Sequence, residues 1–301
     1  MKFKLSFILI FIFSINGISG EIYSEYAIGS RAFGLGQIST YSFYDALSTI
    51  NNPANLVNSE KRMTSFYYSE PNVDEKNIAL GFSVPTYSYG TFGFSYYYFI
   101  MDDLPEINEL GADLGSYSFS QKEFIISYGN SIFNNILYGI NSKWINDKFF
   151  NLITSDINTD NIGLDISIGW LPKFENVWLK YFDLGIIYKN IVQLNDRNDH
   201  IPREIRLIAE NMYKIENHSL FLALNYSWYE NVLKDYNTRL YAGIEYGYKN
   251  IFFRTGYNNN IFSLGLGIYY RFIVLDYGYG EYINNSFIDR SLHNLTLGFK
   301  F

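Results

Sequence analysis

Apolar and polar residues alternate one by one along several short segments of this chain, and this pattern limits the possible folds more than any other feature. In residues 161–169 the apolar set is Ile162, Leu164, Ile166 and Ile168, and the intervening set is Asn161, Gly163, Asp165, Ser167 and Gly169. A β-strand points successive side chains to opposite faces, so one face here is apolar and the other is polar or small. The pattern predicts strands with one face in an apolar environment.

The same alternation recurs near the end of the sequence. Between residues 239 and 248 the two faces are Leu240, Ala242, Ile244, Tyr246, Tyr248 and Arg239, Tyr241, Gly243, Glu245, Gly247. The final segment sets Leu295, Leu297, Phe299 and Phe301 against Asn294, Thr296, Gly298 and Lys300. A final amphipathic strand with a terminal aromatic residue resembles the signal by which bacterial barrels are recognised for assembly, so Phe299 and Phe301 are its candidates.

On this basis we predict an all-β fold, a transmembrane antiparallel β-barrel of about fourteen strands formed by residues 61–301. The predicted strands lie near 62–69, 76–84, 90–99, 119–130, 134–148, 159–170, 177–190, 203–213, 218–229, 237–248, 250–257, 261–270, 271–279 and 291–301. Long connections mostly alternate with short ones, as outer loops and periplasmic turns do. Acidic residues gather in the long connections, where the calcium-loop spacing is absent and solvated loops are expected.

Aromatic composition fits this environment. The chain has 29 Tyr and 26 Phe, and aromatic residues, at 20%, outnumber charged ones, at 18%. Outer-membrane barrels place such side chains in girdles at both edges of the lipid-facing band. A soluble exported β-protein is the alternative, but its one-sided apolar strands would aggregate without lipid.

The first twenty residues have the layout of a secretory signal peptide. Lys2 and Lys4 precede the apolar run 5–15, and small residues lead to a cleavage site after Gly20. A buried N-terminal helix is the alternative. The chain has no cysteine, which excludes a lipoprotein anchor or disulfides. These features predict a protein of the bacterial outer membrane, with lipid as a partner.

Residues 21–60 do not follow the strand pattern and are predicted to form a hatch or plug inside the barrel. Their candidate motif residues are Gly29, Arg31, Gly34, Gly36, Asp45, Asn52, Pro53 and Ala54. The glycine spacing lacks the remaining signature of a nucleotide-binding loop.

Four charged residues are predicted to face the lumen, namely Arg239, Glu245, Arg254 and Asp276. They are expected either to form a ladder of salt bridges that fixes the strand register or to line a polar constriction. Glycines at 243, 247, 265, 267 and 278 are expected either to let a plug pack closely on the wall or to line a ligand channel.

No enzymatic chemistry is indicated, because the three histidines are scattered and no Gly-x-Ser-x-Gly elbow occurs. A catalytic triad assembled across strands is the alternative. No cofactor or metal is predicted. A net charge of −7 without a basic cluster argues against nucleic acid as a partner.

The stretch from Gly29 to Gly36, the Asp45-Ala46 pair and Asn52-Pro53-Ala54 resemble the N-terminus of the PorV/PorQ-type outer-membrane family, which belongs with the FadL-type transporters. Residues 242–280 and 184–190 are similar to later strands of that family. The sequence departs from the family at Asn55 and at Gln37-Ile38. The resemblance implies a fourteen-stranded barrel with an N-terminal hatch.

The resemblance implies two functions. The first is passive uptake of hydrophobic small molecules, such as long-chain fatty acids. The second is a PorV-like scaffold or shuttle that binds the cargo of a protein secretion system at the outer membrane. Neighbouring genes would separate them, because a secretion scaffold should lie beside other components of its machine.

Overall fold

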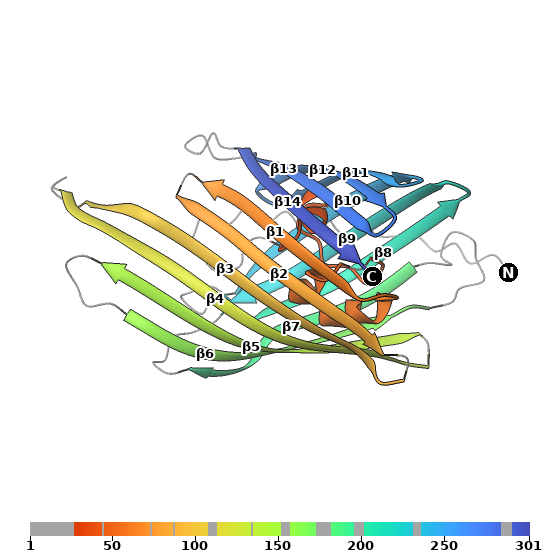
Figure 1. Ribbon diagram of the computed structural model, residues 1–301, viewed down its shortest axis with the longest axis horizontal. Helices are drawn as coiled ribbons and strands as arrows, with labels where there is room; N and C mark the ends of the chain where they lie inside the picture. Colours follow the sequence, from red (N-terminus) through yellow and green to blue (C-terminus); the bar gives the residue numbers. More distant parts are fainter. Residues whose placement is uncertain are drawn as a thin grey trace.

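The protein forms one closed barrel of fourteen antiparallel strands in which each strand pairs with its sequence neighbours and β1 pairs with β14 (Figure 1). The computed structural model describes residues 27–43, 45–72, 74–86, 88–107, 113–133, 135–151, 157–172, 182–195, 202–230, 236–283 and 291–301. The sequence prediction of the fold is confirmed. The predicted signal peptide lies outside the described residues.

The strands are β1 Met63–Asn72, β2 Glu75–Thr86, β3 Gly90–Ile107, β4 Asp113–Ile132, β5 Ile136–Asn151, β6 Ile157–Trp170, β7 Phe182–Asn195, β8 Glu204–Ile215, β9 His218–Glu230, β10 Tyr236–Tyr248, β11 Ile251–Asn258, β12 Ile261–Tyr270, β13 Ile273–Tyr282 and β14 Ser291–Lys300. Because every strand is paired on both sides, the sheet has no free edge. We call the end where β1 begins and β14 ends the terminal end, and the opposite end the loop end.

Alternation along each strand separates an apolar outer face from a polar inner face. On β10 the outward Leu240, Ile244 and Tyr246 are exposed, whereas the inward Tyr241 and Glu245 are buried. Such an exposed apolar surface is unstable in water and stable in lipid. No helix in the described part of the chain is long and apolar enough to cross a membrane.

Two-residue turns join the strands at several places around the terminal end. Glu216, Lys249 and Arg271 begin such turns with φ of 51°, 52° and 52°. Positive φ at this position is typical of type I′ turns, whose twist matches that of the paired strands. These turns hold charged side chains at the mouth of the barrel.

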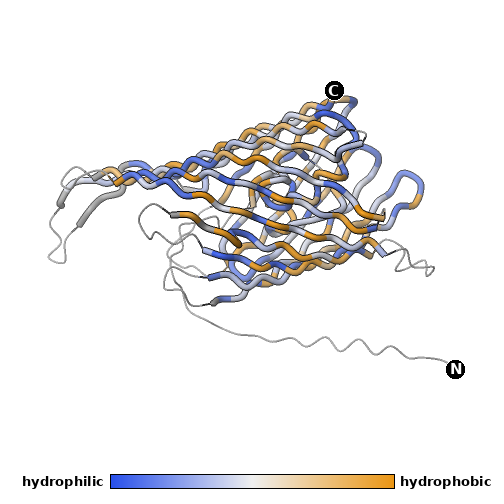
Figure 2. The backbone as a smooth tube through the Cα atoms, turned by 90° about the horizontal axis from the view of Figure 1, so that it is seen from below, coloured by the Kyte–Doolittle hydropathy of each residue, from blue (hydrophilic) through white to orange (hydrophobic). Residues whose placement is uncertain are grey.

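Strands β3 and β4 extend further than the predicted 90–99 and 119–130, and they project past the rest of the barrel at the loop end (Figures 1 and 2). The predicted spans were too short because outward positions beyond them become polar, as at Asp102 and Ser118. Alternation therefore marks only the part of a strand that has an apolar outer face.

Strand β7 differs from its predicted span of 177–190. It continues beyond Asn190, which has a φ of 56° and donates its backbone N–H to the Asp165 carboxylate at 2.9 Å. The register between β6 and β7 shifts at this point, as in a β-bulge. The bulge interrupts the alternation, and residues 177–181 lie outside the described residues.

Residues 27–43 and 45–59, here called the luminal segment, lie inside the barrel (Figure 1). They contain α1 Ser30–Gly34, α2 Ser48–Asn51 and a 3-10 helix, η1, at Pro53–Asn58. Their backbone N–H groups donate to wall side chains: Ser30 to Thr296 at 2.9 Å, Ser39 to Asn225 at 2.6 Å and Ala54 to Ser167 at 2.8 Å. These bonds satisfy irregular backbone inside the lumen. That the segment acts as a hatch stays a prediction.

Inward-facing glycines bring the luminal segment directly onto the wall. A Cβ atom on Gly139 would lie 2.2 Å from the Ala54 nitrogen, and one on Gly256 would lie 2.0 Å from the Gly36 nitrogen. Gly243, Gly265 and Gly278 also contact the segment, whereas Gly247 and Gly267 face wall side chains. Side chains at the contacting positions would occupy the space of the segment's backbone.

Candidate functional site

A chain of four buried charges crosses from the luminal segment to the wall. Arg31 donates from Nε and Nη2 to the two oxygens of Glu245, at 2.9 and 2.6 Å. Arg254 donates from Nε to Glu245 at 2.6 Å and from Nη1 to Asp276 at 2.6 Å. The Tyr269 hydroxyl accepts from Arg254 Nη2 at 3.2 Å. Two cations and two carboxylates alternate, so the chain is electrically neutral.

The surroundings of this charge chain keep Arg31 ionised. Burial alone would lower the pKa of Arg31, but the Glu245 carboxylate beside it raises the pKa above its ordinary value. The Arg31 guanidinium also lies 3.5 Å from the centroid of the Phe43 ring. Gly267 leaves room for the ion pair of Arg254 and Asp276, because a Cβ atom at residue 267 would lie 2.5 Å from Arg254 Nη2 and from Asp276 Oδ1.

Arg239, the fourth charge expected on these walls, lies elsewhere. It is six residues from Glu245 on β10, which is about 20 Å along a strand, and its guanidinium lies 4.3 Å from the centroid of the Tyr229 ring. The sequence pattern put Arg239 on the same inner face as the other three charges, but it did not show how far apart they lie along the barrel axis. Arg31 takes part instead.

A second polar cluster on β8 was missed by the sequence analysis. Arg206 donates to Glu204 and to two atoms of the luminal segment, the Gln37 carbonyl and the Ser39 hydroxyl, both at 3.1 Å. Glu210 accepts from the Tyr41 backbone N–H at 3.0 Å. The signal was present, because Glu204, Arg206 and Glu210 share one face in a period of two.

The Asn52-Pro53-Ala54 motif forms the start of η1. The Asn52 side chain accepts from the Ala54 N–H at 3.2 Å and donates to the Thr40 carbonyl at 2.8 Å. Pro53 occupies the first turn, where its missing N–H leaves no bond unmade. The motif therefore folds one part of the luminal segment against another.

The two departures from the family pattern have structural roles. Gln37 has a φ of 65°, a conformation that favours glycine, and its carbonyl accepts from Arg206. The Asn55 side chain donates to the Phe43 carbonyl and to the Ser48 hydroxyl. The Asn55 contacts use its side chain, whereas the Gln37 contact uses its backbone carbonyl.

Asp45 lies just before α2, where it accepts from the N–H groups of Leu47 and Ser48 at 2.7 and 2.9 Å. Burial, and secondly the nearby Asp276 carboxylate, raise the pKa of Asp45 to about 6. The stability of the fold should therefore fall as pH rises from about 4 through 6, because ionised Asp45 is disfavoured only when folded.

Replacing Asp45 by asparagine should remove this pH dependence, since the amide oxygen can accept the same bonds. Relative to the variant, the wild type should lose at most about 3 kcal/mol of unfolding free energy between pH 4 and pH 8. Urea unfolding of the reconstituted protein measures the difference. The control is Asp102→Asn, an exposed residue at the loop end. Equal pH profiles for the wild type and D45N would contradict the assignment.

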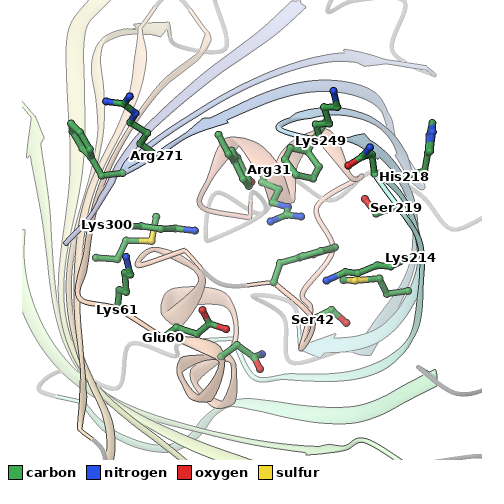
Figure 3. A pocket seen from close by; sticks show the side chains of 18 of the residues that line it. Arg31, Ser42, Glu60, Lys61, Lys214, His218, Ser219, Lys249, Arg271 and Lys300 are labelled. Carbon is green, nitrogen blue, oxygen red and sulfur yellow. The ribbon is translucent and has the colours of Figure 1, made fainter.

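A cavity and the predicted assembly signal both lie at the terminal end. The cavity, of about 940 Å³, opens at the terminal end and has Arg31 and Phe43 in its lining (Figure 3). Phe299 and Phe301 are exposed at the same end, and the Phe301 N–H donates to the Arg62 carbonyl at 3.0 Å. In the described residues, no group of three or more His, Cys, Asp or Glu is placed to hold a metal ion.

No protein-family model matches the sequence, and no curated protein matches it. Solved structures are similar in fold. The Ralstonia pickettii toluene transporter TbuX has a TM-score of 0.63 at 11% identity, over 93% of this chain and 100% of that one. A Pseudomonas aeruginosa FadL homologue has 0.59 at 10%, over 91% and 98%. The Pseudomonas putida toluene transporter TodX has 0.60 at 10%, over 91% and 96%. This chain therefore has the fold of FadL-type hydrocarbon transporters.

Proposed function

We propose that this protein is an outer-membrane channel for the passive uptake of hydrophobic small molecules. The closed barrel with its apolar outer face supports a place in the membrane. Its fold is that of several transporters of hydrophobic compounds along nearly the whole chain. A bacterial outer membrane is the proposed location, with the terminal end facing the periplasm.

The observation that carries the proposal is an apolar track inside the lumen. Leu47 of the luminal segment packs with Tyr97, Phe99 and Met101 of β3, and Phe119 of β4 packs partly buried against them. The Phe99 and Phe119 rings lie 6.1 Å apart. The track runs from the loop end of the wall to the luminal segment. Apolar side chains of this kind lower the free energy of a hydrophobic solute that contacts them inside the barrel.

We propose further that the luminal segment is the hatch of this channel. It touches the wall through glycines and through charged contacts at Glu245 and Arg206. Transport requires some of these contacts to open or shift, because the segment closes off the apolar track at Leu47. The paired charges would give the hatch a defined closed position.

The substrate is proposed only as a class. Two of the similar structures are named as toluene transporters and another as a FadL homologue. For this chain we propose compounds with a large apolar part, including long-chain fatty acids. The PorV/PorQ-type resemblance, and with it a scaffold that binds secretion-machinery proteins, remains the alternative prediction. Neither function needs a catalytic residue, a cofactor or a metal.

Uptake by cells tests the proposal through the apolar track. Phe119→Asn should lower the uptake rate of radiolabelled toluene or a long-chain fatty acid about tenfold, because the polar amide replaces apolar surface that a hydrophobic solute would contact beside the Phe99 ring. Phe150→Asn is the matched control, since Phe150 lies on the neighbouring β5 near the same level and faces outward. The assay uses cells whose own hydrophobic channels are deleted.

Assembly of each variant is checked by heat-modifiable migration in gels. Uptake above the empty-vector background by the wild type and the control, with loss in F119N, supports the channel. An assembled wild-type barrel without uptake above background would refute transport and favour the scaffold.

A further inference from the structure

Five cationic side chains surround the cavity at the terminal end, here called the vestibule. They come from separate elements: Lys61 precedes β1, Lys300 ends β14, Lys214 lies near the end of β8, and Lys249 and Arg271 begin two turns (Figure 3). Their places around the mouth follow from the strand register. The vestibule is thus a ring of cations and not a single cluster.

These five cations have no carboxylate within ion-pairing distance in the described part of the chain. Lys249 and Arg271 lie instead at the rim, over the exposed rings of Tyr248 and Tyr270, at 5.4 and 5.3 Å from the ring centroids, and Lys300 lies 5.7 Å from the centroid of the Tyr269 ring in the vestibule lining. This contrasts with the charge chain deeper in the lumen, where every charge is paired.

The local charge is opposite to that of the whole protein. Five cations that have no ion pair among the described residues line the vestibule together with two carboxylates, Glu60 and Glu216, which leaves an excess of three positive charges. The chain as a whole carries −7. A concave surface with low-dielectric walls concentrates such a potential and attracts anions.

The floor of the vestibule is partly apolar. Phe43, Phe252 and Tyr269 line it together with Met63 and Met212. The Phe252 and Tyr269 rings lie 4.5 Å apart. An occupant would therefore meet cations around the mouth and aromatic surface below.

We propose that the vestibule is a docking site for an acidic, extended segment of a periplasmic protein. The cations are distributed around a cavity of about 940 Å³ and do not converge on one point. A single phosphate or carboxylate would reach only some of them, whereas several carboxylates along one peptide can reach most of them. Complementary charge of this kind gives a fast and salt-sensitive association.

This proposal rests on the proposed orientation of the barrel but not on transport, so the two can fail separately. The probe is a short peptide of alternating glutamate and alanine with an uncharged dye. Its binding to the full-length protein in a neutral detergent is followed by fluorescence anisotropy at low ionic strength. Lys61→Gln combined with Lys300→Gln should weaken binding at least about fivefold, as should Lys214→Gln combined with Lys249→Gln.

The matched control combines Lys76→Gln with Lys148→Gln, two exposed lysines on β2 and β5 towards the loop end. This control should bind like the wild type, and physiological salt should weaken both. A lysine-alanine peptide should not bind.

Competition separates the possible occupants. Decanoate, inorganic phosphate and phosphatidylglycerol in mixed micelles are added at the same concentration of anionic groups as the peptide. Failure of all three to displace it supports a peptide site. Displacement by any of them, or equal weakening by the control variant, would overturn the proposal in favour of a small anion, a lipid headgroup or a nonspecific effect.

Discussion

Replacing Arg254 by methionine is expected to lower the free energy of unfolding by about 3–5 kcal/mol. The Arg254 side chain is fully buried, with 0% exposure, and its two ion pairs join Glu245 to Asp276. Methionine fills a similar space without charge. Glu245 would keep Arg31 as a partner, whereas Asp276 would lose its ion pair in the lumen. A buried charge that has lost its partner costs more free energy than the removal of both charges.

A double variant tests this explanation. Arg254→Met combined with Asp276→Asn removes the charge that the single variant leaves unpaired, so at least half of the lost stability should return. Guanidinium unfolding of reconstituted protein, followed by tryptophan fluorescence, measures both. If the double variant is as unstable as the sum of the two single variants, the two residues are not coupled.

The wall of this protein could be predicted from sequence because lipid and lumen impose opposite requirements on alternate residues. Leu240, Ile244 and Tyr246 must suit lipid, and Glu245 between them must not. The strand prediction was less accurate where this strict alternation ended. At Asp102 and Ser118 the outward face becomes polar, and at Asn190 a bulge shifts the register.

The candidate site was predicted less completely. Period-two alternation placed Glu245, Arg254 and Asp276 on the inner face, where they lie together. It could not show that Arg31 completes the chain, because the luminal segment has irregular backbone and no period. Arg239 lies on the same inner face but at a different position along the barrel axis. That position depends on the stagger of the strands and not on the alternation of residues.

The inward-facing glycines also show what the sequence alone could not predict. Gly243 and Gly247 look equivalent in sequence, since both face the lumen from β10. Only Gly243 contacts the luminal segment, where a Cβ atom would lie 2.5 Å from the Leu35 carbonyl oxygen. A Cβ atom on Gly247 would lie 2.3 Å from the Ser219 hydroxyl instead. The distinction appears only when the path of the segment is known.

Replacing Gly256 by valine should release this part of the luminal segment and raise the ion conductance of the barrel several-fold. A Cβ atom there would lie 2.0 Å from both the Gly36 nitrogen and the Leu35 carbonyl carbon. These are backbone atoms, so no rotamer change can make room. Strand β11 is held by ladders on both sides, with β10 and β12, and the segment is held by fewer bonds. The segment is therefore the part expected to move.

Single-channel recording in planar bilayers measures the conductance, and amide hydrogen exchange of residues 30–58 reports the release directly. Gly247→Val is the matched control, because valine there meets the side chains of Ser219 and Phe252 and not the segment. The control should assemble with wild-type conductance. Unchanged conductance and exchange in G256V would mean that the wall yields instead, and that the luminal segment is a fixed part of the barrel rather than a hatch.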